Sequence, residues 1–195
     1  MSVAAGDLAG GKRYYEQGLT IRRKLAEADD TNAGLQRDLS GSFNNLGKVS
    51  VAEGDLAGAK RYFEQGLTIA RKLAEADDTN AEWQRDLSIS FDRLGNVSVA
   101  AVDLAGAKRY FEQGLTIRSK LAEADDTNAQ MQRDLYVSYL RIADIMEKEN
   151  DPEATDNWRQ AHDIMASMVQ RGLHVTPQDL SILDWLRKKL GDQKP

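Results

Sequence analysis

The chain has 195 residues, of which 41% are hydrophobic and 29% are charged, and its formal net charge is −5. This composition is too hydrophobic for an intrinsically disordered chain. The charges are of both signs and slightly acidic overall, which disfavours bulk attraction to nucleic acid or anionic lipid. Cysteine is absent, which excludes disulfides and cysteine metal sites. No stretch approaches the roughly 18 apolar residues of a membrane span. We therefore expect a folded cytoplasmic protein.

The chain is organised by a repeat of 48 residues. The tetrapeptide Asp-Leu-Ala-Gly begins at Asp7, Asp55 and Asp103. Residues 7–38 and 55–86 are identical at 27 of 32 positions. A fixed period of this length is typical of solenoids, in which each repeat buries its apolar face only against its neighbours.

In chain order, we expect one repeat domain over residues 1–195. It comprises a half repeat (1–30), three repeats (31–78, 79–126 and 127–172) and a C-terminal capping helix (176–191). The segment Ser2-Val3-Ala4 matches Ser50-Val51-Ala52, so the chain is expected to begin near the end of a repeat's first helix. The last repeat is degenerate, and a one-residue deletion near Thr155 explains its shifted register.

Each repeat is predicted to be a pair of helices. Apolar and small residues recur at steps of three and four, as on one face of a helix, for example at Ala59, Phe63 and Gly66. Gly54 followed by Asp55 predicts a tight turn, with the acid capping the second helix. Between repeats, Thr79 and Glu82 have the spacing of a capping box, which predicts that the next helix begins at Thr79.

The two ends of the chain differ. Thr176, Pro177 and Asp179 predict the start of a capping helix, with four leucines over the preceding hairpin at Leu180, Leu183, Leu186 and Leu190. At the other end, the helix expected from Asp7 to Ala28 lacks the first helix of its own hairpin. We expect Leu8, Tyr15 and Leu19 to be partly uncovered. Either the chain is a fragment of a longer array or something else covers this face, and we predict self-association through this end.

No group of residues predicts catalysis. His162 and His174 have no helical spacing between them and no histidine or cysteine partner for a metal. The acidic turn at 77–80 lacks the glycine and glutamate of a calcium loop, and helix capping explains it better. We therefore predict no enzymatic activity, no metal and no cofactor.

The repeat resembles the tetratricopeptide repeat, whose unit is a helix hairpin. The residues that carry the resemblance are Leu46-Gly47, Ala59, Phe63 and Gly66. Arg71 stands where a proline usually ends the second helix, and the helical pattern continues to Glu75, so the unit is elongated. Residues 43–47 and 63–73 look most like the longer repeats of kinesin light chains and their bacterial relatives. The resemblance implies an all-α, right-handed superhelical solenoid of antiparallel helix hairpins.

The resemblance also implies a function, which is a non-catalytic scaffold that binds a peptide or protein on its concave face. In the family, the first helix of each repeat lines that face, and here its polar positions differ between repeats while the scaffold residues do not. The candidate partner-binding residues are Asn44, Asn45, Lys48, Asp92, Arg93, Asn96, Leu140, Arg141 and Asp144. Sequence drift at exposed positions is the alternative explanation for this variation.

Other interpretations stay open at this point. Some family members grip a peptide's terminal carboxylate, but Asp92 stands where that site needs a lysine, so we do not predict this recognition. The recurring pair Arg37-Asp38 predicts an ion pair between adjacent repeats, with a ligand contact as the alternative. A regulatory sensor module within a larger signalling protein is the rival function. Binding of RNA is less favoured, because the basic residues of the second helices are spaced with acids.

Overall fold

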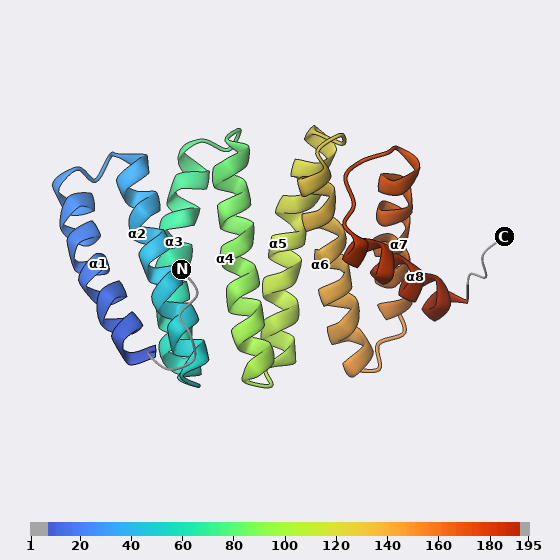
Figure 1. The fold of residues 1–195 in the computed structure, drawn as a ribbon, viewed down its shortest axis with the longest axis horizontal. Helices are drawn as coiled ribbons and strands as arrows, with labels where there is room; N and C mark the ends of the chain where they lie inside the picture. Colours follow the sequence, from blue (N-terminus) through green and yellow to red (C-terminus); the bar gives the residue numbers. More distant parts are fainter. Residues whose placement is uncertain (1–7, 192–195) are drawn as a thin grey trace. The chain divides into compact units, whose positions relative to one another are not determined.

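The computed structural model describes residues 8–191, which form eight helices and contain no strand (Figure 1). The predicted all-α fold is confirmed, whereas the right-handed superhelical twist stays a prediction. Contacts divide the chain into two compact units, residues 1–103 and 104–195. The predicted match at Ser2-Val3-Ala4 and the predicted helix start at Asp7 lie outside the described residues.

The first unit contains four helices that run alternately up and down (Figure 1). Their bounds are α1 (Leu8–Ala28), α2 (Ala33–Ala52), α3 (Leu56–Ala76) and α4 (Ala81–Ala100). Each helix packs on the one that precedes it in the chain. The predicted hairpin of one repeat is therefore the pair formed by α2 and α3.

Close packing within this hairpin depends on Gly47. The side chain of Phe63 on α3 is 3% exposed, and a Cβ atom at Gly47 would lie 2.4 Å from its ring. Real Cβ atoms do not approach other atoms so closely, so only glycine allows the two helices this separation. The expectation that Gly47 permits the approach and that Phe63 fills the space is confirmed.

The turn between α2 and α3 has the predicted form. Gly54 has a φ of 78°, a left-handed conformation that glycine adopts without a steric cost. Asp55 caps α3, because its Oδ1 atom accepts a hydrogen bond of 2.8 Å from the backbone N–H of Gly58. The backbone N–H of Asp55 also donates to the carbonyl of Ser50 at 2.9 Å, which closes the end of α2.

Val102 occupies the same left-handed position one repeat later, with a φ of 59°. A β-branched residue is strained there, and its side chain is 81% exposed and so gains little from packing. We expect Val102→Gly to raise the free energy of unfolding by about 1 kcal/mol, measured by urea denaturation. As a control, Ala101→Gly places glycine at the preceding residue, where φ is −85°, and should lower stability.

The turn between α3 and α4 differs from the prediction by one residue. The cap of α4 is Asn80, whose side chain accepts a hydrogen bond of 3.1 Å from the N–H of Trp83. Thr79 instead donates its hydroxyl to Asp77 at 2.7 Å, so the predicted capping box of Thr79 and Glu82 is wrong. Both residues can cap a helix, and the aspartate two residues upstream holds the threonine in the turn.

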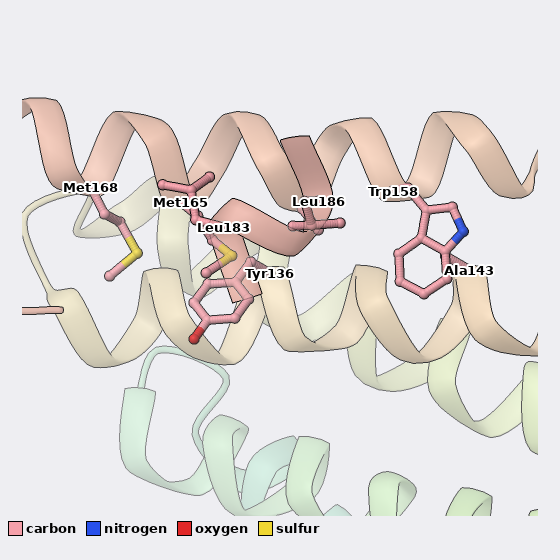
Figure 2. Packing of buried hydrophobic residues seen from close by; sticks show 8 residues of the cluster. Tyr136, Ala143, Trp158, Met165, Met168, Leu183 and Leu186 are labelled. Carbon is pink, nitrogen blue, oxygen red and sulfur yellow. The ribbon is translucent and has the colours of Figure 1, made fainter. Parts of the chain in front are cut away.

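The second unit contains α5 (Leu104–Ala124), α6 (Ala129–Lys148), α7 (Ala154–Gln170) and α8 (Pro177–Leu190). A hydrophobic core lies where α6, α7 and α8 meet (Figure 2). Large residues of this core are Tyr136, Trp158, Met165, Met168, Leu183 and Leu186. Helix α8 thus buries the apolar face of the last hairpin, as a capping helix must.

Helix α8 begins as predicted. Thr176 and Asp179 form a capping box, and Pro177 is the first helical residue. Its apolar face is narrower than predicted, because Leu183 and Leu186 are buried whereas Leu180 is 43% exposed. The buried residues are three positions apart, so they share one side of the helix.

Asp179 also binds two residues of α6. Its carboxylate accepts the hydroxyl hydrogen of Tyr136 and lies 3.0 Å from the guanidinium of Arg133. Burial acts to raise the pKa of Asp179, but hydrogen bonds from Tyr136 and Thr176 and the charge of Arg133 outweigh it and hold the pKa below its usual value. The burial of Tyr136 and its bond to Asp179 raise the pKa of the phenol. The pair therefore consists of a neutral phenol and an ionised carboxylate at neutral pH.

Candidate functional site

A polar pocket of about 460 Å³ opens in the first unit. Its walls come mainly from α2 and α4, which are the first helices of successive repeats, with further residues from α1 and α3. Its charged and amide residues are Arg22, Arg37, Asp38, Asn44, Asn45, Asp86 and Arg93. The hydroxyl groups of Ser42 and Ser90 also line it.

Asn44 is a polar residue placed inside this packed wall. Its side chain is 8% exposed, and its Oδ1 atom is buried with no hydrogen-bond partner. Gly66 on α3 makes room for it, because a Cβ atom there would lie 3.0 Å from Oδ1. A buried acceptor without a partner costs free energy, so Asn44 is an unfavourable choice for packing alone.

Arg37 is held by acids of the next repeat. Its Nε atom lies 2.6 Å from Asp86, and its Nη2 atom lies 2.7 Å from Glu82. The hydrogen bonds to these two acids raise the pKa of Arg37. The predicted ion pair between adjacent repeats is confirmed for Arg37, which leaves its charge largely neutralised within the wall.

The other two arginines give the pocket a positive character. Arg22 reaches from α1 and donates from Nη1 to the Ser42 hydroxyl at 3.2 Å. Burial lowers the pKa of Arg93, and the nearby charges of Asp86 and Asp92 oppose this shift. An arginine stays protonated in either case. Because Asp86 and Glu82 balance Arg37, the positive character of the cavity comes from Arg22 and Arg93, and Asp38 is the remaining acid of its lining.

The structure brings together three of the nine predicted residues. Asn44, Asn45 and Arg93 line the same pocket. Lys48 and Asn96 lie one helical turn further along α2 and α4, are exposed, and do not line it. Asp92 was expected on an open surface, but it is 8% exposed and belongs to the packed part of α4.

The three predicted residues of the second unit lie in three different environments. Leu140 packs against the core of α6, α7 and α8. The guanidinium of Arg141 lies 5.6 Å from the ring centre of Phe111, a cation–π contact. Asp144 is exposed and binds Lys148 at 2.7 Å. A leucine in a core has a packing role, so Leu140 is a poor candidate for partner binding.

Sequence reasoning missed Arg22, Ser42 and Ser90. Arg22 belongs to a second helix, and only first helices were expected to line a binding surface. A signal was present, because Arg22 stands at one of the five positions that differ between residues 7–38 and 55–86, where Ala70 is its counterpart. Variation in second helices therefore identifies site residues as well.

Within residues 8–191, no helix has both the length and the apolar run that crossing a bilayer needs. In the same part of the chain, histidine, aspartate and glutamate side chains form no group of three that could hold a metal ion.

The hairpins, the repeated turns and the capping helix define the class: the chain is an α-helical repeat protein. Residues 39–80 match the family model described as tetratricopeptide repeat, which confirms the predicted repeat type. This match contains most of the hairpin of α2 and α3, and the pocket's amides, Asn44 and Asn45, lie within it.

A solved structure supports this fold. The chain is similar to BtubC (BKLC) from P. vanneervenii, at 15% sequence identity and a TM-score of 0.53, covering 95% of this chain and 85% of that chain. The designed helical repeat protein DHR64 is also similar, at 11% identity and a TM-score of 0.38, covering 95% of each chain. The likeness to BtubC, at this low identity, shows the fold alone. No curated protein matches the sequence significantly.

Proposed function

We propose that this protein is a non-catalytic scaffold that binds a peptide segment of another protein in the pocket of its first unit. Tetratricopeptide repeats generally bind proteins or peptides. The observation that carries the proposal is that amides and hydroxyls from two successive first helices, at Ser42, Asn44, Asn45 and Ser90, line one pocket. An extended peptide offers backbone N–H and C=O groups that can pair with such groups.

The amides and hydroxyls of the pocket suit a peptide backbone. Asn44 and Asn45 each carry a carbonyl oxygen and an NH₂ group, so each can accept from one backbone group and donate to another. Ser42 and Ser90 add hydroxyls that can do either. These contacts do not depend on the ligand's side chains, so they supply affinity rather than sequence preference.

Sequence preference would come from the arginines. Arg37 is engaged by Asp86 and Glu82, so Arg22 and Arg93 are the cations best placed to meet a ligand. A guanidinium binds a carboxylate through two parallel hydrogen bonds, which is strong in a partly buried site. The preferred segment therefore carries an aspartate or glutamate side chain.

A random-peptide library tests this proposal. The full chain is immobilised and panned against displayed peptides of about 12 residues, a length whose extended reach exceeds the pocket. The recovered peptides should be enriched in aspartate and glutamate. Arg93→Ala should weaken their binding about tenfold or more, because a charge-assisted hydrogen bond contributes about 1.5–3 kcal/mol.

The matched control is Lys72→Ala, which removes a positive charge from an exposed position of α3 outside the pocket. Its effect on affinity should be less than about twofold, since exposed charges are screened by salt. Equal losses for the two variants would contradict the assignment of the site. Recovery of no binding peptide would contradict the proposed function itself. If the chain bound no peptide but bound RNA with an affinity that fell steeply with added salt, RNA binding would be favoured instead.

A further inference from the structure

Helices α1, α3 and α5 are three copies of nearly the same sequence. Helices α3 and α5 differ at only two of 21 positions, where Ala70 and Arg71 of α3 correspond to Arg118 and Ser119 of α5. Helix α1 also carries an arginine, Arg22, at the position of Ala70. Ala70 is therefore the one residue of α3 that differs from its counterparts in both other helices.

The arginine at this position binds a serine of the helix that follows. In the pair formed by α5 and α6, Arg118 is 4% exposed, and its Nη1 atom donates a hydrogen bond of 2.7 Å to the hydroxyl oxygen of Ser138. In the pair formed by α1 and α2, Arg22 donates from the same atom to Ser42 at 3.2 Å. Both serines lie 20 residues after their arginine, so the bond belongs to the repeat.

In the pair formed by α3 and α4, the serine is present but the arginine is not. The hydroxyl of Ser90 donates to the carbonyl of Asp86 at 3.0 Å, and Ser138 makes the same bond within its own helix. Ala70 and Ser90 both line the polar pocket of the first unit. Because the side chain of Ala70 ends at Cβ, the space that Arg118 fills beside Ser138 is part of the pocket beside Ser90.

We propose that Ala70 opens this pocket to a peptide, and that a side chain of the bound peptide takes the place beside Ser90 that arginine takes in the other two helix pairs. This inference rests on the proposed peptide binding and adds the residue that controls access to the site. The Ser90 hydroxyl keeps an acceptor lone pair while it donates to Asp86, so the place suits a ligand group that carries an N–H.

The substitution Ala70→Arg is expected to close the pocket without unfolding the chain. It leaves Arg71 as the one difference between α3 and α5, and α5 already buries an arginine at this position. The introduced guanidinium can donate to Ser90 as Arg118 donates to Ser138. The variant should therefore keep the circular dichroism spectrum of the parent chain.

The affinity for an acidic peptide recovered by panning on the parent chain tests this inference. Ala70→Arg should weaken binding at least about tenfold, because the arginine occupies the place of a ligand side chain. The substitution also adds a positive charge, which would attract an acidic peptide if the pocket stayed open. Unchanged or tighter binding would therefore overturn the inference.

Two controls separate the effect of the space from the effects of position and charge. Ala70→Ser keeps a small side chain at the same position, and Thr68→Arg adds the same charge to an exposed residue of α3 outside the pocket. Both variants should bind the peptide within about twofold of the parent chain. A loss of affinity in either control equal to that of Ala70→Arg would also overturn the inference.

The bond to Ser90 is tested without any peptide by a double-mutant cycle. Ser90→Ala is introduced into the parent chain and into the Ala70→Arg chain, and the midpoints of urea denaturation are compared. The midpoint should fall further in the Ala70→Arg chain, because the substitution also removes the acceptor of the introduced guanidinium. Equal shifts would overturn the inference, whereas failure of the parent chain to bind any peptide would contradict the proposed function.

Discussion

Replacing Gly47 with alanine is expected to lower the free energy of unfolding by about 3 kcal/mol, at the upper end of the usual cost of overpacking a core. The added Cβ atom would lie 2.4, 2.6 and 2.8 Å from three atoms of the Phe63 ring. That ring is 3% exposed, so it cannot swing into solvent to relieve the contact. The two helices must move apart instead, and the packing of α2 on α3 is lost in part.

The control lies six residues earlier in the same helix. A Cβ atom at Gly41 would meet no atom within 4 Å, so Gly41→Ala should raise stability by about 0.5–1 kcal/mol through helix propensity alone. Urea denaturation followed by circular dichroism measures both variants. If the two substitutions changed stability in the same direction, the close approach at Gly47 would not limit the fold.

Replacing Asp179 with alanine is expected to destabilise the second unit by about 2–4 kcal/mol, because it removes the hydrogen bonds of a buried carboxylate and half of a capping box. The side chain is 2% exposed. Its loss leaves Arg133 and Tyr136 without their acceptor and removes the reciprocal half of the capping box with Thr176. Thermal unfolding should show a lower midpoint for the part of the chain that contains α8.

The control for this substitution is Asp184→Ala in the same helix. Asp184 is exposed and binds only Arg187, at 3.2 Å, among the described ion pairs. Its loss should cost less than about 1 kcal/mol, as is usual for a surface pair. Similar midpoints for the two variants would show that burial of Asp179 contributes little to the attachment of α8.

The pH dependence of stability follows from the lowered pKa of Asp179. Since this carboxyl releases its proton more readily when folded than when unfolded, its contribution is complete above the unfolded carboxyl pKa of about 4. The contribution is lost as the pH falls below that value and through the folded pKa. The difference in stability between the parent chain and Asp179→Asn should therefore shrink as the pH is lowered from 5 towards 2.

The fold was predictable because the same pattern of structural residues occurs in several repeats. Positions such as Gly47, Phe63 and Asp55 recur at 48-residue steps, and each has a local physical role that the structure confirms. The helix start at Asn80 was not predictable from spacing. Thr79 and Asn80 are both good caps, and the hydrogen bond from Thr79 to Asp77 decides between them.

The candidate site was predictable only in part. Asn44, Asn45 and Arg93 follow from the rule that first helices carry the variable polar positions. Arg22 does not follow from it, because its long side chain reaches the pocket from a second helix. Leu140 and Asp92 also vary between repeats, but Leu140 packs beside a core and Asp92 is buried. Sequence variation alone cannot separate a changed ligand contact from a changed core.

The most direct test of peptide binding is a nuclear magnetic resonance titration of the ¹⁵N-labelled chain with an acidic peptide recovered by panning. We expect the largest shifts on the side-chain NH₂ signals of Asn44 and Asn45 and on the Nε–H signals of Arg22 and Arg93. Shifts confined to Lys48, Asn96 and other residues outside the pocket would contradict peptide binding in this pocket. The Arg93→Ala chain provides the reference, because the same peptide concentration should then leave the Asn44 signal nearly unmoved.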